Sequence, residues 1–256
     1  MTRLYMNETT ISYRIIGYPR SIIATLLSYI ATFLYCGVCV IGALFLGGNQ
    51  QFFTFMIRAW SRSVCWLNSI QVEIEGLENI PKSGAIYCFN HSSHFDIPTI
   101  YSELPFLRFG AKAELFSIPV FGSCLKAIGT LPIVRGNIEK VLRLYDESIA
   151  RVQKGESFVL APEGTRQPGP ELGTFKGGPF IFAINAQAPI VPLVLEGVNE
   201  ILPKAAFIPN WGKISQPVRI KILPQIDTKG FTLEDRPALQ EKARRAMRQA
   251  HSLITN

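Results

Sequence analysis

Ala85-Ile-Tyr-Cys-Phe-Asn-His-Ser-Ser-His-Phe-Asp96 joins an apolar pentapeptide to a polar segment that holds two of the three histidines in the chain. Residues 85–89 have the length and apolar character of a buried strand. His91 follows directly, and Asp96 lies five positions later, a spacing that lets a carboxylate orient an imidazole. Because imidazole titrates near neutral pH, His91 is a candidate general base for a hydroxyl group.

The residues around this stretch alternate between strand and helix patterns. Val72 and Ile74 alternate with polar residues in 71–75, and apolar residues recur on one face of 137–153 behind the capping residue Asn137. The same reasoning predicts strands at 85–89, 107–112, 131–134, 157–160, 190–195 and 218–222, and helices at about 177–187 and 234–254. This alternation predicts an α/β domain with a mixed sheet flanked by helices.

The N-terminal part of the chain is far more apolar than the rest. No charged residue occurs from 21 to 57, and 21–46 is almost entirely apolar. A helix over 21–46 would be about 39 Å long at about 1.5 Å per residue, and the hydrocarbon core of a bilayer is about 30 Å thick. We therefore expect an N-terminal membrane-anchoring helix. Basic residues on both sides of it leave open a single span or a hairpin that dips into one leaflet: Arg14, Arg20, Arg58 and Arg62.

A second helix is predicted after the turn at 47–49. Apolar residues share one of its faces and two arginines share another: Phe53, Ile57, Trp60 and Val64 against Arg58 and Arg62. The pattern is typical of an interfacial amphipathic helix with Trp60 and Trp66 at headgroup level, and a helix packed in the core is the alternative. We expect residues 1–69 to form the anchor and residues 70–256 to form the α/β domain.

The composition narrows the possible partners and the compartment. A formal net charge of +7 favours an anionic partner such as a membrane surface, a phosphorylated substrate or nucleic acid. The sequence has no zinc-finger spacing, RNP-like aromatic motif or long Lys/Arg block, which argues against nucleic acid. Its five cysteines are odd in number and scattered, unlike a secreted disulfide framework. Cys36 and Cys39 lie in the apolar run, so we interpret them as buried helix residues.

A second polar motif, Pro162-Glu-Gly-Thr-Arg166, follows the predicted strand at 157–160. Glycine permits close backbone approach, backbone N–H groups and Thr165 can donate hydrogen bonds, and Arg166 offers a bidentate fork. Together these groups suit a phosphate or carboxylate ligand. The alternative is a tight turn that holds a structural Glu163–Arg166 ion pair.

Two further basic residues follow predicted strands. Lys112 ends the strand at 107–112, and Arg135 comes directly after the strand at 131–134. In α/β sheets the carboxyl ends of the strands line the ligand crevice. His91, Lys112, Arg135 and residues 163–166 are therefore expected to face one crevice, and ordinary surface charge is the alternative for Lys112 and Arg135.

Four motifs in this order resemble those of the glycerolipid acyltransferase family, specifically the 1-acylglycerol-3-phosphate (lysophosphatidic acid) acyltransferases. They are Asn90-His-Ser-Ser-His-Phe-Asp-Ile97; Lys112-Ala-Glu-Leu115 with Pro119, Gly122 and Arg135; Pro162-Glu-Gly-Thr-Arg166 with Phe175-Lys-Gly-Gly178; and Pro189-Ile-Val-Pro-Leu193. The resemblance extends over about residues 70–225, and four ordered motifs are far more specific than one. Ala161 stands where phenylalanine is common and His94 occupies a variable position, which leaves substrate choice open.

The resemblance implies roles for these residues. His91 would be the general base that deprotonates a free glycerol hydroxyl, and Asp96 its partner, with no covalent acyl-enzyme. A Gly-x-Ser-x-Gly elbow does not occur in the sequence, in keeping with direct transfer. The glycerophosphate-binding role falls on Glu163, Gly164, Thr165 and Arg166, with Lys112 and Arg135 near the phosphate or the oxyanion. No cofactor or metal is implied: the co-substrate is an acyl thioester of coenzyme A or of acyl carrier protein.

The implied setting is a membrane protein, integral or monotopic, with its active site at the cytoplasmic face and lipids as partners. Another acceptor, such as a lyso-ornithine lipid or a lysophospholipid with a larger headgroup, is an alternative. A metal-dependent hydrolase with His91, His94 and Asp96 as ligands is a more distant one, since the only other histidine is His251. A catalytically silent membrane-binding protein is a third class. Acyl-chain length, donor and oligomeric state are not indicated.

Overall fold

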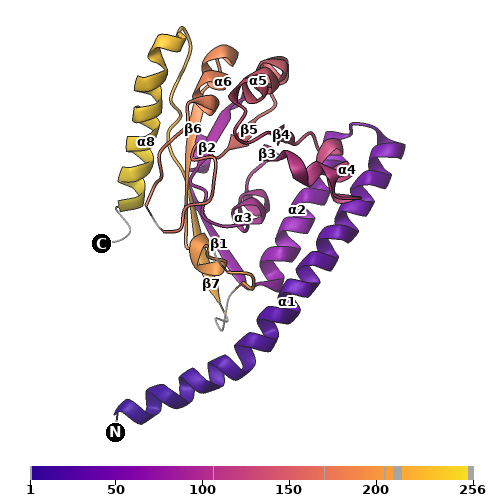
Figure 1. Cartoon of the computed structure of the whole chain (residues 1–256), viewed down its shortest axis with the longest axis vertical. Helices are drawn as coiled ribbons and strands as arrows, with labels where there is room; N and C mark the ends of the chain where they lie inside the picture. Colours follow the sequence, from indigo (N-terminus) through magenta and orange to yellow (C-terminus); the bar gives the residue numbers. More distant parts are fainter. Residues whose placement is uncertain (1, 106, 170, 205, 210–214, 253–256) are drawn as a thin grey trace.

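The strands of the described residues form one seven-stranded sheet (Figure 1). The computed structural model describes residues 2–105, 107–169, 171–204, 206–209 and 215–252. The strand order is β1-β7-β6-β2-β5-β3-β4. The strands are β1 (Ile70–Glu75), β2 (Ile86–Phe89), β3 (Arg108–Lys112), β4 (Leu131–Ile133), β5 (Phe158–Leu160), β6 (Ile190–Glu196) and β7 (Gln216–Ile222). Each corresponds to a predicted strand, so the mixed α/β fold is confirmed.

Strand direction decides where a site can form. β2, β5, β3, β4 and β6 run parallel to one another, whereas β7 is antiparallel to β6 and parallel to β1. The carboxyl ends of five strands therefore meet at one edge of the sheet, which is where α/β proteins place ligands.

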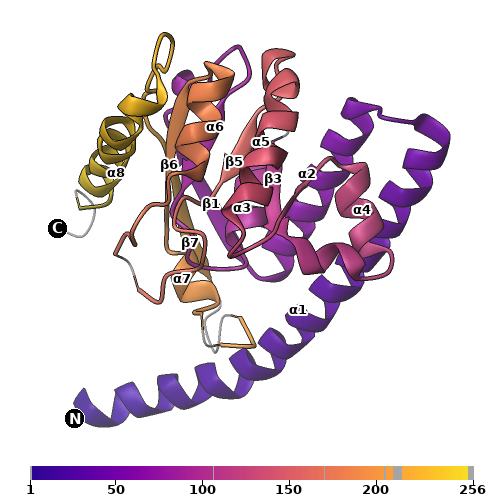
Figure 2. The same cartoon turned by 45° about the horizontal axis from the view of Figure 1, so that its top comes forward.

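Helices cover both faces of this sheet (Figures 1 and 2). One face carries α1 (Thr2–Leu46), α2 (Gln50–Leu67), α3 (Asp96–Glu103) and α4 (Phe121–Ala127), and the other carries α5 (Ile138–Gln153), α6 (Gly178–Ala186) and α8 (Arg236–Ser252). The short α7 (Val198–Ile201) follows β6, and 3-10 turns lie at Leu77–Asn79, Ala113–Ser117 and Leu233–Asp235. The helices predicted at 137–153, 177–187 and 234–254 are α5, α6 and α8, although residues 253 and 254 lie outside the described residues.

Strand β2 shows how the two layers share the sheet. Successive side chains of a strand point to opposite faces of the sheet. All four residues of β2 are buried because helices cover both faces. Tyr87 and Phe89 pack in the apolar cluster beneath α1–α4, and Ile86 and Cys88 pack in the cluster beneath α5, α6 and α8. An apolar strand buried on both faces lies in the middle of the sheet, so the residues that follow it lie at the centre of the strand-end edge.

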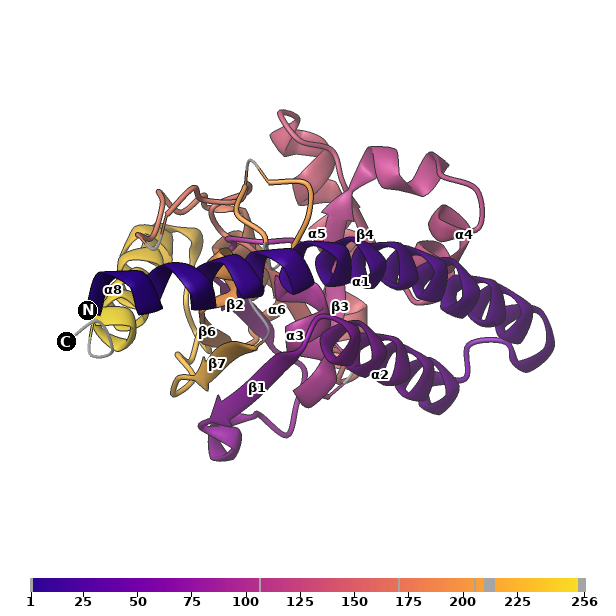
Figure 3. The same ribbon diagram turned by 90° about the horizontal axis from the view of Figure 1, so that it is seen from below.

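Helix α1 is longer than the expected 21–46 helix and begins at Thr2. Its segment Gly17–Leu46 is long and apolar enough to cross a membrane: an 18-residue window within it has a mean hydropathy of 2.2, and only 11% of that window is buried. Figure 3 shows α1 passing across the underside of the domain. Most of its large apolar side chains therefore face outward, among them Leu26, Ile30, Leu34 and Phe45.

Helix α2 corrects one prediction. Its apolar residues Phe53, Ile57 and Val64 are buried in the core rather than presented to lipid, so the interfacial interpretation is wrong and the core-packing alternative is right. Trp60 also packs against the core, and its indole N–H donates to Oγ1 of Thr32 on α1 at 2.9 Å. Trp66 is exposed, and its position at headgroup level stays a prediction. The division into 1–69 and 70–256 stays a prediction, since α1 and α2 share one core with the sheet.

The two arginines of α2 bind the end of another helix. Nη2 of Arg58 donates to the carbonyl oxygens of Glu103 and Leu104 at 3.2 and 3.3 Å, and Nε of Arg62 donates to that of Ser102 at 3.3 Å. These carbonyls close α3, where a positive charge complements the helix dipole and satisfies free acceptors. Because α3 begins at Asp96, this contact fixes the helix that carries the candidate catalytic carboxylate.

Candidate active site

The side chains of His91 and Asp96 form a hydrogen-bonded pair at the carboxyl end of β2. Nδ1 of His91 lies 2.7 Å from Oδ2 of Asp96, the carboxylate is fully buried and the histidine side chain is 17% exposed. With a carboxylate beside it, Nδ1 carries the proton and the lone pair stays on Nε2. The pair thus has the geometry of a general base and the group that orients it.

The fold around Asp96 explains how a buried carboxylate is tolerated. Asp96 begins α3, and its Oδ2 accepts the backbone N–H groups of Ser92 and Ser93 at 2.9 and 3.1 Å in addition to His91. Free N–H groups and a positive dipole end favour an anion at a helix N-terminus. A buried charge without such donors would be very costly. The two serines were not assigned a role from sequence, and their backbone contribution has no residue-type signal.

Asn90 is a second site residue that sequence reasoning left without a role. It is buried, and its carboxamide pairs with both backbone groups of Leu195, the donor and acceptor distances each being 2.8 Å. The only sequence signal was a polar residue directly at the end of an apolar strand. The pairing ties the turn that contains His91 to the end of β6.

Glu163 is placed beside His91, but its carboxylate points inward. It is 3% exposed, with Oε2 accepting the backbone N–H of His91 at 2.9 Å and Oε1 accepting that of Gly173 at 2.8 Å. Burial raises the pKa of Glu163, and the N–H groups of His91 and Gly173 partly offset this effect. The structural ion pair between Glu163 and Arg166, which was the alternative interpretation of this motif, is not formed in the described residues.

Gly164 occupies a position that suits glycine alone. Its φ of +70° lies in the left-handed region, and a Cβ there would lie 2.9 Å from Nζ of Lys176. The backbone N–H of Lys176 also donates to the carbonyl oxygen of Pro162 at 2.7 Å. The exposed ammonium group of Lys176 therefore lies against the turn at 162–166. The sequence analysis included Phe175-Lys176 in a motif but assigned no role to Lys176.

Thr165 and Arg166 complete this turn at the surface. Thr165 is exposed and Arg166 is partly exposed. No side-chain hydrogen bond or ion pair of Arg166 occurs within the described part of the chain. Partial burial lowers the pKa of His94, and the positive charges of Arg166 and His91 lower it further. The guanidinium thus lies near His94 of the motif, and its side chain is free to bind an anion.

Lys112 and Arg135 lie at the expected edge of the sheet, but farther from His91 than the turn at 162–166 does. The strand order puts β3 two positions and β4 three positions from β2, which is about 10 and 14 Å at about 4.8 Å per strand. Both side chains are exposed, and Nζ of Lys112 lies 3.6 Å from Oε1 of Glu114. The structure therefore brings together His91, Asp96 and residues 163–166, with Lys112 and Arg135 at the outer part of the same edge.

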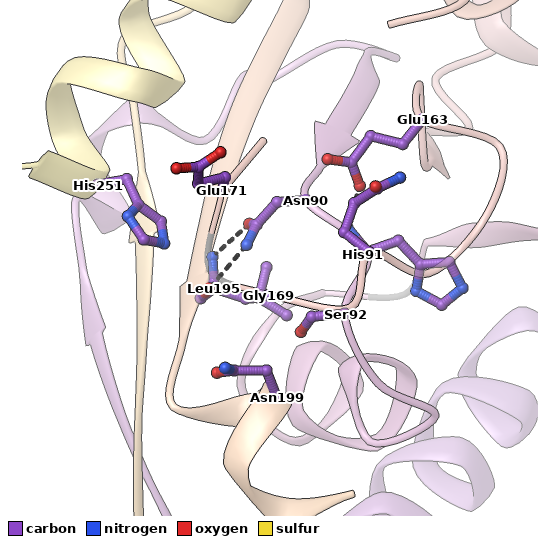
Figure 4. Close-up of a pocket in the computed structure, with 10 residues that line it drawn as sticks. Asn90, His91, Ser92, Glu163, Gly169, Glu171, Leu195, Asn199 and His251 are labelled. Carbon is purple, nitrogen blue, oxygen red and sulfur yellow. Dashed lines mark hydrogen bonds between the residues drawn. The ribbon is translucent and has the colours of Figure 1, made fainter. Parts of the chain in front are cut away.

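A small polar cavity lies behind the turn that carries His91 (Figure 4). Asn90, Ser92, Glu163, Glu171, Asn199 and His251 are among the residues that line it, and it holds only about 10 Å³ of space. That is room for about one water molecule. Figure 4 shows the imidazole of His91 turned away from it. A ligand that contacts the imidazole would therefore reach it from the side away from this cavity.

His91, His94 and Asp96 do not form a metal centre in this geometry. In the ranges that the structure describes, no group of three or more His, Cys, Asp or Glu side chains is arranged to hold a metal ion. Nδ1 of His91 is taken by Asp96. The metal-dependent hydrolase therefore finds no support in the arrangement of these residues.

The chain is similar in sequence and fold to acyltransferases. The family model described as Acyltransferase matches residues 71–196, which contain His91, Asp96 and the turn at 162–166. Among solved structures, the crystal structure of the 1-acyl-sn-glycerophosphate (LPA) acyltransferase PlsC from Thermotoga maritima is similar. It is 26% identical, with a TM-score of 0.64 over 89% of this chain and 97% of that chain.

Curated relatives narrow the family. The chain is 33% identical over 157 residues to the chloroplastic 1-acyl-sn-glycerol-3-phosphate acyltransferase BAT2 of Brassica napus, which is 60% of this chain and 45% of that protein. It is 30% identical over 230 residues to acl-1 of Caenorhabditis elegans, which is provisionally named for the same activity. That match covers 84% of this chain and 85% of the nematode protein. The chain thus spans about half the length of the plant relative and most of the nematode one. It belongs to the acyltransferase family, and these relatives and the solved structure are named as 1-acylglycerol-3-phosphate acyltransferases.

Proposed function

We propose that this protein transfers an acyl group from an acyl thioester to the free glycerol hydroxyl of lysophosphatidic acid, giving phosphatidic acid. The observation that carries the proposal is the 2.7 Å hydrogen bond between His91 and Asp96, with the cationic turn at 162–166 beside it. A base next to an anion-binding group suits a substrate that has both a hydroxyl group and a phosphate.

His91 acts as the general base in this reaction. Its Nε2 takes the proton of the glycerol hydroxyl as the oxygen attacks the thioester carbonyl, forming a C–O bond. The tetrahedral intermediate collapses, the C–S bond breaks, and the thiolate leaves with the proton that His91 returns. Asp96 holds the imidazole in orientation and stabilises its protonated form. No covalent acyl-enzyme occurs in this sequence of steps.

The headgroup phosphate is held by the turn at 162–166. Arg166 supplies a bidentate fork, the hydroxyl group of Thr165 supplies an O–H donor, and Lys176 adds a positive charge. The N–H of Gly164 donates to the carbonyl oxygen of Ala161 at 3.0 Å, so Gly164 contributes close approach of the backbone rather than a donor. The exposure of Thr165 and the absence of a described side-chain partner for Arg166 support this role. Lys112 and Arg135, farther along the edge, attract the phosphate or the anionic donor rather than touch the reacting atoms.

Helix α1 anchors the protein in the membrane that contains the acceptor lipid. Its exposed apolar face and the hydropathy of Gly17–Leu46 support this setting. The active site then lies at the cytoplasmic surface, where a water-soluble donor and a lipid acceptor meet. Holding both reactants at that boundary lowers the entropic cost of bringing them together. The donor is a thioester of coenzyme A or of acyl carrier protein, and the chemistry calls for no further cofactor.

The proposal is tested by an acceptor and donor panel with purified protein in liposomes. Lysophosphatidic acid, a lyso-ornithine lipid and a lysophospholipid with a larger headgroup are each supplied either with long-chain acyl-coenzyme A or with an acyl carrier protein that carries the same acyl group as a thioester. We expect phosphatidic acid as the main product. Preferential acylation of another acceptor would overturn the acceptor assignment, and no acylation by folded protein with any pair would overturn the proposal.

A further inference from the structure

Two loops meet at the active site and are joined through His91. The first runs from β2 to α3, and the second runs from β5 through Glu163 to Gly173. The backbone of His91 is bound on both sides by the second loop: its N–H donates to Oε2 of Glu163 at 2.9 Å, and its carbonyl oxygen accepts the N–H of Gln167 at 2.7 Å. The main chain of His91 is therefore fixed by groups that do not touch its imidazole.

The carboxylate of Glu163 is fully occupied by this contact. Its other oxygen accepts the N–H of Gly173 at 2.8 Å, and the residue is 3% exposed. A carboxylate that binds two backbone donors inside the protein has no free face for a glycerophosphate headgroup. It is also an anion, so direct contact with a substrate phosphate would be repulsive. Both points separate Glu163 from its exposed neighbours Thr165 and Arg166.

The same contact sets the distance between the base and the cation. Arg166 follows Glu163 by three residues on the turn, and its charge reaches His94 in the loop of His91. A carboxylate that clamps one loop to the other therefore fixes the imidazole relative to the groups that hold the phosphate. Misplacement of reacting groups by about 1 Å can lower a rate by about 10²-fold.

We propose that Glu163 is a positioning residue that clamps the loop of His91 to the 163–173 loop, in place of the substrate contact predicted for it from the resemblance. The inference rests on the proposed function, since it concerns the rate of acyl transfer. Glu163 acts through the backbone of His91 and sets where the imidazole lies, while Arg166 and Lys176 face the headgroup.

The first test compares Glu163→Ala and Glu163→Gln with wild type, with the exposed α5 residue substituted in Glu147→Gln as a control. The amide of glutamine keeps one acceptor oxygen for one of the two N–H groups, whereas alanine keeps none. We expect kcat to fall about 10²-fold in Glu163→Ala and less in Glu163→Gln, with KM for lysophosphatidic acid unchanged. A rise in KM at unchanged kcat would overturn the proposal in favour of substrate contact.

The second test separates positioning from a loss of folded protein. Lysophosphatidic acid is titrated calorimetrically into His91→Ala and into His91→Ala with Glu163→Gln. We expect the same Kd and the same stoichiometry, because the binding groups stay in place. Weaker binding would identify a substrate contact, and a reduced stoichiometry would identify a merely structural role, and either overturns the proposal. Inactive wild-type protein would instead be a failure of the proposed function, since these binding measurements do not depend on turnover.

Discussion

The carboxamide of Asn90 replaces a strand neighbour for Leu195. Nδ2 of Asn90 donates to the carbonyl oxygen of Leu195 and Oδ1 accepts its N–H, both at 2.8 Å. The β2–β6 backbone pairing ends at Phe89 and Leu193, so the side chain continues it beyond the point where the strand turns into the loop of His91. The start of the catalytic turn is thereby tied to the centre of the sheet.

Asn90→Ala is expected to lower the free energy of unfolding. The substitution leaves the buried N–H and C=O of Leu195 without partners, at a cost of about 1–3 kcal/mol for each group. Chemical unfolding in detergent measures the change. Asn185→Ala removes an exposed carboxamide that binds Asp146 and is the matched control, with an expected change of about 0.5 kcal/mol or less. Equal stabilities of the two variants would contradict the account of Asn90.

Asp96→Asn is expected to reduce kcat strongly while the protein stays folded. An amide at this position no longer fixes the Nδ1–H form of His91 or stabilises its protonated state, and proton transfer contributes about 10²–10⁴-fold to such rates. Steady-state kinetics with circular dichroism as a check on folding measures the effect. A folded variant with a wild-type rate would mean that the buried pair is structural.

Glu156 predicts a pH dependence of stability far from the active site. Its Oε2 accepts from Nε of Arg108 and Nη2 of Arg151, both at 2.8 Å. Burial alone would raise the pKa of Glu156, but the hydrogen bonds and charges of the two arginines outweigh it and lower the pKa. The ion pairs therefore stabilise the protein fully above the ordinary glutamate pKa of 4.5, and this contribution is lost as the pH falls through the lowered value.

We accordingly expect Glu156→Gln to be less stable than wild type at pH 7, with a gap that narrows as the pH falls below the ordinary glutamate value. Thermal unfolding at a series of pH values measures the gap. Glu147→Gln, at an exposed position of α5, should show no such trend. A constant gap between Glu156→Gln and wild type at all pH values would show that the arginines do not shift the titration of Glu156.

The exposed face of α1 predicts a membrane phenotype. Ile30 and Leu34 are 55% and 65% exposed, lie one turn apart and are near the middle of Gly17–Leu46. A lysine at the centre of a membrane helix costs about 3 kcal/mol, so Ile30→Lys with Leu34→Lys should weaken membrane association. Carbonate extraction of membranes measures it, with the exposed α5 residue in Ile138→Lys as control. Equal retention of the double variant and wild type would remove α1 as the anchor.

Most of the sheet and the catalytic pair could be predicted from local pattern. Short apolar runs such as 85–89 and 190–195 are typical of buried central strands in an α/β fold. The spacing between His91 and Asp96 is short enough to be set by one turn of the chain. Membership of the acyltransferase family was likewise visible in the order of four motifs, and it is confirmed.

Features set by tertiary contacts were missed. The face of α2 that carries Phe53 and Ile57 has the same periodicity whether it meets lipid or a core, and only the position of α3 and the sheet decides between them. The resemblance implied a headgroup contact for Glu163, and nothing in the sequence signalled its burial, because glutamate is rarely buried. The backbone donors that permit its burial belong to His91, 72 residues away, and to Gly173, ten residues away across an irregular loop.

The most direct test of the central claim is the rate of phosphatidic acid formation by wild type and by His91→Ala. Both are assayed in liposomes with lysophosphatidic acid and a long-chain acyl thioester, using the donor that the panel identifies. We expect product from wild type and a loss of about 10²–10⁴-fold in His91→Ala, the usual contribution of a general base, with the thermal midpoint retained. A folded His91→Ala variant that forms phosphatidic acid at the wild-type rate would contradict the assignment of His91 as the base.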